Sequence, residues 1–243
     1  MINLIKIQLF KLRKSKVFYG CLVLNILIVA TMIMVRVQIG NIDSAKAYLD
    51  IMYKNYVFLL PLLCVTVSFA SQGFSQKVIY PVIARGVSIK KLFIAQEIAL
   101  CIVASLYCIA GTVTGILFCN FYFHNDFNIQ LYLIVIKICA IEIIVHCAYV
   151  IFVFSLTYII RNGKISVFIN FTLLIFLPAL LHGLMKVINT HINLRNLWIG
   201  NVVNIIEPGL EKAWYGYAIL ISLIYIILSS IISLLINTKR DFS

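Results

Sequence analysis

The sequence predicts an all-α membrane protein with six transmembrane helices, an N-terminal interfacial helix and a short helical segment between the fifth and sixth spans. Two observations carry this prediction. The chain has 243 residues and is 63% apolar, whereas a soluble domain is about half apolar. Its apolar residues also form continuous runs of roughly 20 residues, the length of a membrane-crossing helix, without the alternation of barrel strands. We expect residues 1–243 to form a single transmembrane domain.

Residues 1–16 are expected to form the interfacial helix. Four apolar residues share one helical face and four bases lie off it: Ile2, Ile5, Leu9 and Leu12, then Lys6, Lys11, Arg13 and Lys14. A basic amphipathic helix of this kind lies on the inner leaflet, where anionic lipid attracts it. The alternative is that this segment extends the first span as one continuous helix whose bases reach the headgroups.

Six apolar runs follow, and they cover residues 17–37, 55–72, 92–119, 131–160, 165–185 and 214–236. The outer loop 186–213 between the last two runs is longer and partly apolar. Pro208 and Gly209 break any helix there, so we expect one or two short helices in this loop. Trp198 and Trp214 are expected at the headgroup level, where tryptophan is enriched.

The loops fall into two alternating sets that differ in charge. Residues 1–16, 73–91, 161–164 and the C-terminal tail are rich in bases and contain a single acid, Asp241. The other set holds bases and acids in similar numbers. The positive-inside rule places the basic set, and with it both termini, in the cytoplasm. This orientation also explains the net charge of +12 without nucleic acid as a partner.

Motifs for catalysis are absent from the sequence. It contains no phosphate-binding loop, no nucleophile elbow, no HExxH and no paired-carboxylate motif. We therefore expect no catalytic residue, no cofactor and no metal, and we do not expect the chain to be an enzyme. The seven cysteines are expected to act as small apolar residues in the spans, in preference to disulfides or metal ligands.

Three ionisable side chains lie inside the run 131–160: Lys137, Glu142 and His146. Such groups are costly, by roughly 2.5–3.5 kcal/mol on insertion scales for the worst residues, so each requires a partner or a route to the surface. Glu142 and His146 are four residues apart and can form a hydrogen bond or an ion pair on one face. Lys137 lies about 140° from Glu142 around the helix and can reach outward. We interpret these residues either as a polar patch on a substrate or proton path, or as a contact that holds the bundle.

The loop at residues 73–91 has an apolar middle and four bases, which suits a segment docked at the membrane surface. The stretch FASQGFSQKVIYPVIARGVSIKKLFIAQE and the charged end Thr238–Phe242, together with the order of spans, resemble type-2 ABC exporter permeases. The similarity is to the short Gram-positive permeases of peptide-antibiotic self-protection or toxin-peptide export. Gln72 and Gln76 stand where that family commonly has an acid.

The resemblance implies a transmembrane permease subunit of an ATP-driven exporter of amphipathic, antimicrobial or toxin peptides in the bacterial plasma membrane. Its partners would be a separate ATPase subunit, a second copy or a sister permease, and membrane lipid. Closure of the ATPase would push on the loop and tilt the second and third spans. The ATPase-coupling residues would be Gln76, Lys77, Ile79, Tyr80, Pro81, Val82 and Arg85.

Three alternatives remain open at the level of the sequence. The loop could be an ordinary basic tether rather than a coupling segment. The chain could be a proton-coupled secondary transporter that uses Glu142 and His146, or a non-transporting membrane immunity or assembly protein.

Overall fold

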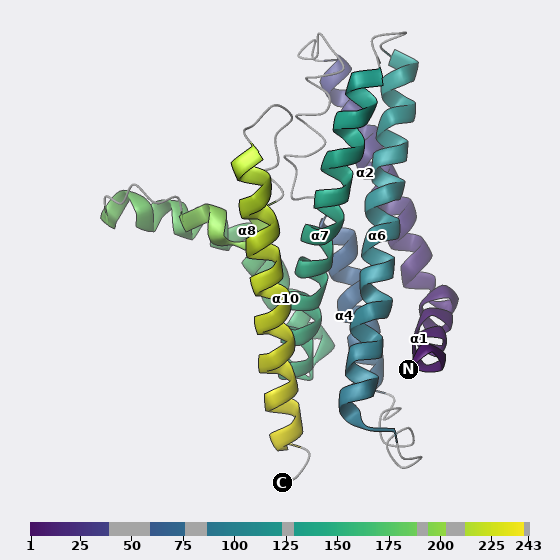
Figure 1. The fold of residues 1–243 in the computed structure, drawn as a ribbon, viewed down its shortest axis with the longest axis vertical. Coiled ribbons are helices and arrows are strands. Elements are labelled where there is room, and N and C mark those ends of the chain that lie inside the picture. Colours follow the sequence, from purple (N-terminus) through teal and green to yellow (C-terminus); the bar gives the residue numbers. More distant parts are fainter. Residues whose placement is uncertain (39–58, 76–86, 123–128, 189–193, 203–211, 241–243) are drawn as a thin grey trace.

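A computed structural model describes residues 1–38, 59–75, 87–122, 129–188, 194–202 and 212–240, and within these ranges all regular secondary structure is helical (Figure 1). Five of its helices are long and apolar enough to cross a membrane: α2, α6, α7, α8 and α10. The elements are α1 (Ile2–Lys14), α2 (Lys16–Gln38), α4 (Leu59–Ser75), α6 (Ile89–Tyr122), α7 (Ile129–Ile160), α8 (Gly163–Ile188), the 3-10 helix η2 (Leu194–Leu197), α9 (Ile199–Val202) and α10 (Lys212–Arg240). Each predicted span overlaps one of these helices.

The second predicted span corresponds to α4, which is shorter than the other spans. Its 17 residues rise about 25 Å, less than the roughly 30 Å of the hydrocarbon. The prediction began this span at residue 55, and residues 39–58 lie outside the described part of the chain. Six crossings therefore stay a prediction, while five potential spans and one shorter apolar helix are observed.

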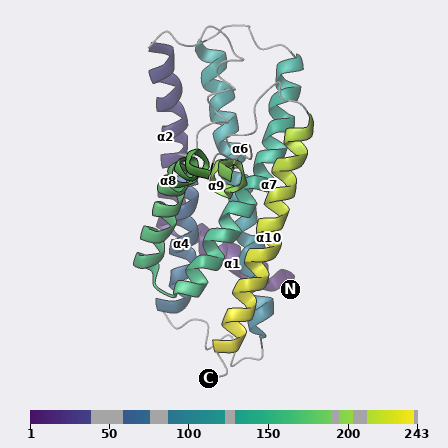
Figure 2. The same cartoon turned by 90° about the vertical axis from the view of Figure 1, so that its left-hand side faces the viewer.

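α1 and α2 are separate helices. Ser15, between them, has φ −76° and ψ 123°, an extended conformation that ends α1, and its N–H donates to the carbonyl of Leu12 at 3.0 Å. The alternative of one continuous N-terminal helix is therefore wrong. α1 lies across the bundle (Figure 2) and packs against α6 and α2. Its buried side chains are Gln8 and Leu12, whereas Ile2, which we had placed on the same face, is 70% exposed.

α6 and α7 form the centre of the molecule. Within the membrane-length apolar stretch of each of these two helices, 61% of the residues are buried. The corresponding share is 22% in α2 and 17% in both α8 and α10. α7 contacts α6, α4, α10, α8 and α9, and α6 also contacts α1 and α2. Successive long helices run in opposite directions, so α1 and the C-terminal end of α10 lie toward the same end of the bundle (Figures 1 and 2).

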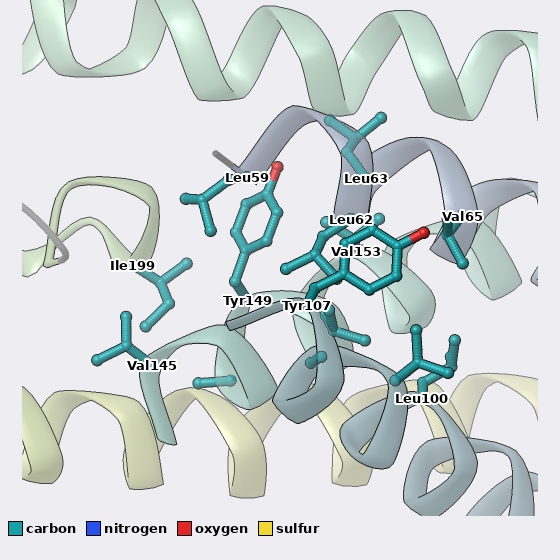
Figure 3. Close-up of a cluster of buried hydrophobic side chains, with 14 of the residues drawn as sticks. Leu59, Leu62, Leu63, Val65, Leu100, Tyr107, Val145, Tyr149, Val153 and Ile199 are labelled. Carbon is teal, nitrogen blue, oxygen red and sulfur yellow. The ribbon is translucent and has the colours of Figure 1, made fainter. Parts of the chain in front are cut away.

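The buried core fills the space between α4, α6, α7 and α9. Figure 3 shows Leu62 of α4, Tyr107 of α6, Tyr149 and Val153 of α7, and Ile199 of α9 directed into this region, and all five are at most 1% exposed. The outer faces of α2, α8 and α10, in contrast, carry exposed apolar side chains, as expected for helices that contact lipid.

The α6–α2 contact is fixed by two hydrogen bonds to backbone. Asn25 Nδ2 of α2 donates to the carbonyl of Tyr107 at 3.1 Å, and the Tyr107 hydroxyl donates to the carbonyl of Phe18 at 2.6 Å. Polar side chains buried in an apolar bundle are stable only with such partners.

A two-residue connection joins α7 to α8. Arg161 has φ 56° and its N–H donates to the carbonyl of Thr157 at 2.9 Å, the left-handed arrangement that commonly ends a helix. Asn162 then caps α8, because its Oδ1 accepts the N–H groups of Lys164 at 3.1 Å and Ile165 at 3.2 Å. The tight turn explains why α7 and α8 lie against one another.

α8 bends, and the chain after it returns into the bundle. Pro178 lies inside the helix, where it removes a backbone hydrogen bond, and the second half of α8 points away from the other helices (Figure 1).

The expected short helices between the last two spans are present as η2 and α9. Trp198 is 5% exposed and packs edge-to-face on Phe152 of α7 and Tyr225 of α10. Its ring is therefore part of the core, and its predicted level at the headgroups stays a prediction.

Candidate functional site

The predicted ATPase-coupling residues, from Gln76 to Arg85, lie outside the described residues, and their roles stay a prediction. The described flanks define where this loop attaches. α4 ends at Ser75 and α6 begins at Ile89. The Ser88 hydroxyl accepts the N–H of Lys91 at 3.4 Å and its carbonyl accepts the N–H of Leu92 at 3.1 Å, so Ser88 caps the first turn of α6. A force on the loop would therefore act first on α4 and α6.

Of the three ionisable residues predicted in the fourth span, Lys137 is exposed, whereas Glu142 and His146 are both 6% exposed. The expected separation of Lys137 from the other two is confirmed. Glu142 and His146 do share a face, but their side chains do not pair. His146 Nδ1 donates to the backbone carbonyl of Glu142 at 2.7 Å, and the Glu142 carboxylate is directed to α6 instead.

The Glu142 carboxylate belongs to a polar cluster between α6 and α7. Its Oε2 lies 3.8 Å from the sulfur of Cys108, which in turn lies 4.0 Å from the sulfur of Cys139. Thr112 completes the cluster, with its hydroxyl 3.5 Å from the Cys139 sulfur and 3.0 Å from the Cys108 carbonyl. The antiparallel packing of α6 and α7 brings these residues together, although they are about 30 residues apart in sequence.

A second buried carboxylate, Glu97, joins α6 to α10. Glu97 is 8% exposed, and its Oε1 accepts a hydrogen bond from the Ser230 hydroxyl at 2.7 Å. Its neighbour Gln96 accepts a hydrogen bond from the hydroxyl of Tyr158 on α7. Sequence reasoning missed Ser230, Gln96 and Tyr158, because nothing in a uniformly apolar run indicates which residue of another helix will face it.

The two buried carboxylates, Glu97 and Glu142, are groups in the interior of the bundle that could bind a proton or a cation. Neither Glu97 nor Glu142 forms an ion pair with a described residue, and their side-chain partners are a hydroxyl and a thiol. Buried carboxylates without a base are typical of proton or cation pathways, and also of polar contacts that hold a bundle together. No group of three or more potential metal ligands occurs in the described ranges.

Comparison with known proteins adds no relative. No family model matches the chain. No curated protein matches it either.

Proposed function

We propose that this chain is the transmembrane permease subunit of an ATP-driven exporter of amphipathic or antimicrobial and toxin peptides. It works with a separate ATPase subunit and a second copy or sister permease in the bacterial plasma membrane, with both termini in the cytoplasm. The observation that supports this best is α1, a basic helix that is distinct from the first span and packs on the central helix α6. This agrees with the layout on which the resemblance to type-2 ABC permeases rests.

The packing at the start of α6 supports a mechanism in which motion of the loop reaches the centre of the bundle. Phe93, in the first turns of α6, contacts the rings of Phe154 and Tyr158 on α7 at centroid distances of 5.0 and 5.2 Å. The hydrogen bond between Gln96 and Tyr158 lies one turn further along. Closure of the ATPase pair would push on the loop before α6, and these contacts would carry the displacement to α7.

The membrane partner of α1 is anionic lipid in this proposal. Its bases Lys6, Lys11, Arg13 and Lys14 are exposed. Phe10 is 55% exposed among them, with the ammonium group of Lys14 4.7 Å from its ring centroid. An exposed aromatic ring flanked by bases suits the headgroup region, where the ring enters the acyl boundary and the bases meet phosphate.

Capture of the ATPase from native membranes tests the proposal. We expect the tagged chain to co-purify with a nucleotide-binding subunit, and the double variant Lys77→Ala/Arg85→Ala to lose it. The matched control is Lys239→Ala/Arg240→Ala, which removes the same number of charges from the basic C-terminal end and should retain the partner. Native chain that brings down no nucleotide-binding subunit would contradict the proposal and favour a non-transporting membrane protein.

A proton-coupled secondary transporter is the second candidate, and the buried Glu142 beside His146 is the observation that favours it. In that case Glu142→Gln would abolish transport into vesicles, while removal of ATP under a maintained proton gradient would not. The exporter predicts the reverse pattern, with transport that stops without ATP and survives Glu142→Gln.

A further inference from the structure

The cysteines are arranged in pairs across helix interfaces. All seven are free thiols. Cys108 of α6 faces Cys139 of α7, and Cys147 of α7 lies against the backbone of Cys101 of α6. Cys21 of α2 lies near Cys64 of α4. Cysteines used only as small apolar residues would not need this arrangement.

The sulfurs of Cys108 and Cys139 are in contact across the interface between α6 and α7. The two sulfurs are 4.0 Å apart, and the Cys108 sulfur is also 3.9 Å from the backbone carbonyl of Cys139. The Cys147 sulfur lies 3.6 Å from the carbonyl of Cys101, so α6 and α7 are close along this whole seam. A disulfide requires the sulfurs to approach to about 2.05 Å, which is about 2 Å closer than they lie here.

The two thiols of this pair differ in their surroundings. Cys139 is partly exposed, and its sulfur lies 3.5 Å from the Thr112 hydroxyl, which is also 3.0 Å from the carbonyl of Cys108. Cys108 is 6% exposed and lies beside the carboxylate of Glu142. A partly exposed thiol next to a second thiol that can resolve it is the arrangement of a redox-sensitive cysteine pair.

We propose that Cys139 and Cys108 form a redox modification site, at which a membrane-soluble organic hydroperoxide converts the two thiols to a disulfide that links α7 to α6. The Cys139 sulfur attacks the terminal peroxide oxygen, the O–O bond breaks, and the alcohol leaves with one proton. The Cys108 sulfur then attacks the Cys139 sulfenic acid, the S–O bond breaks and water leaves. Two thiols and one hydroperoxide give one disulfide, one alcohol and one water, and the peroxide gains the two electrons that the thiols lose.

The functional consequence follows from the position of the link, and it rests on the proposed function. α6 and α7 are the two central helices and run in opposite directions. A covalent link between them prevents the relative sliding or rotation through which the loop before α6 would open a path. Oxidation therefore halts peptide-stimulated ATP hydrolysis by the complex, and a reductant restores it.

Peptide mapping of the full chain in lipid vesicles tests the site itself. Lys137 separates the two cysteines, so trypsin places Cys108 in the fragment 92–137 and Cys139 in the fragment 138–161. After treatment with cumene hydroperoxide and alkylation of free thiols, we expect these fragments to be joined by a bond that dithiothreitol breaks. Cys108→Ser and Cys139→Ser should each lose the joined species, whereas the matched controls Cys101→Ser and Cys147→Ser should retain it.

Two outcomes would overturn the site: fragments that stay separate in the oxidised native chain, or a joined species that persists in Cys108→Ser and disappears in Cys101→Ser. Hydrolysis by the complex is the second readout. If the disulfide forms but ATP hydrolysis by the complex does not change, the proposed arrest of transport is contradicted. The assignment of Cys108 and Cys139 as a redox site would still hold. Absence of any associated ATPase contradicts the proposed function, while the mapping result still decides the site.

Discussion

Asn162 is the residue on which the turn between α7 and α8 depends. Its Oδ1 accepts two N–H groups at the start of α8, in a part of the chain where no other described side chain is bonded to them. Asn162→Ala should lower the free energy of unfolding by about 1 kcal/mol, the usual contribution of an N-cap. Thermal unfolding in detergent measures this, and Asn162→Asp, which retains the acceptor, is the control that should remain close to native.

The Glu97–Ser230 hydrogen bond gives a second prediction at this scale. Ser230→Ala leaves a buried carboxylate of α6 without its described partner, so it should destabilise the protein by about 1–3 kcal/mol. Ser229→Ala removes the same hydroxyl from the adjacent position of α10 and should have little effect. Equal unfolding midpoints for the two variants would contradict the structural role of this contact.

Residue-level contacts were the least predictable part of the molecule. The sequence alone indicated that Glu142, His146 and Lys137 are unusual in a membrane span, and the helical period placed Lys137 on a different face from the other two. It did not indicate that His146 would bond to backbone, or that Glu142 would face Cys108. Those partners depend on the register between α6 and α7, and a continuous apolar run does not determine that register.

The contact between α4 and α8 depends on Gly163, the first residue of α8. A Cβ built there would lie 2.8 Å from the Cβ of Ser71, closer than side chains approach. Gly163→Ala should therefore force the helices apart and cost about 1–3 kcal/mol. Gly183→Ala, in the same helix with nothing within 4 Å of the added atom, should be neutral or stabilising by up to about 1 kcal/mol.

A double variant sharpens this test. Ser71→Gly removes the atoms that the new methyl group meets, so Gly163→Ala should cost less in that background when unfolding is measured under the same conditions. If Gly163→Ala and Gly183→Ala had the same effect, the close approach of α4 and α8 would be incorrect.

Elements were predicted far better than their packing. The position of each long helix follows from the length of an apolar run, because only a helix satisfies its own backbone in lipid. The break at Ser15, the bend in α8 and the return of α9 into the core do not follow from hydropathy. They depend on one capping residue, one proline and the fit of Trp198 between two aromatic rings.

At the scale of the whole molecule, the helices that flank the predicted coupling loop belong to the central part of the bundle. α1 and the end of α10 lie toward one end, and the flanks of the predicted coupling loop, α4 and α6, are both part of the buried core. The central claim is that this loop passes motion from an ATPase to α6 and α7. That claim concerns Tyr80 and Arg85, which lie outside the described residues and were chosen from the sequence.

The measurement that tests this claim most directly is ATP hydrolysis by the co-purified complex, with and without candidate peptides. We compare the native chain with Tyr80→Ala/Arg85→Ala and, as a matched control, Tyr19→Ala/Arg240→Ala, which removes the same residue types from α2 and the end of α10. The coupling account predicts that only the loop variant loses peptide stimulation or releases the ATPase. Stimulation that is unchanged in the loop variant, or a native chain with which no ATPase associates, would contradict it.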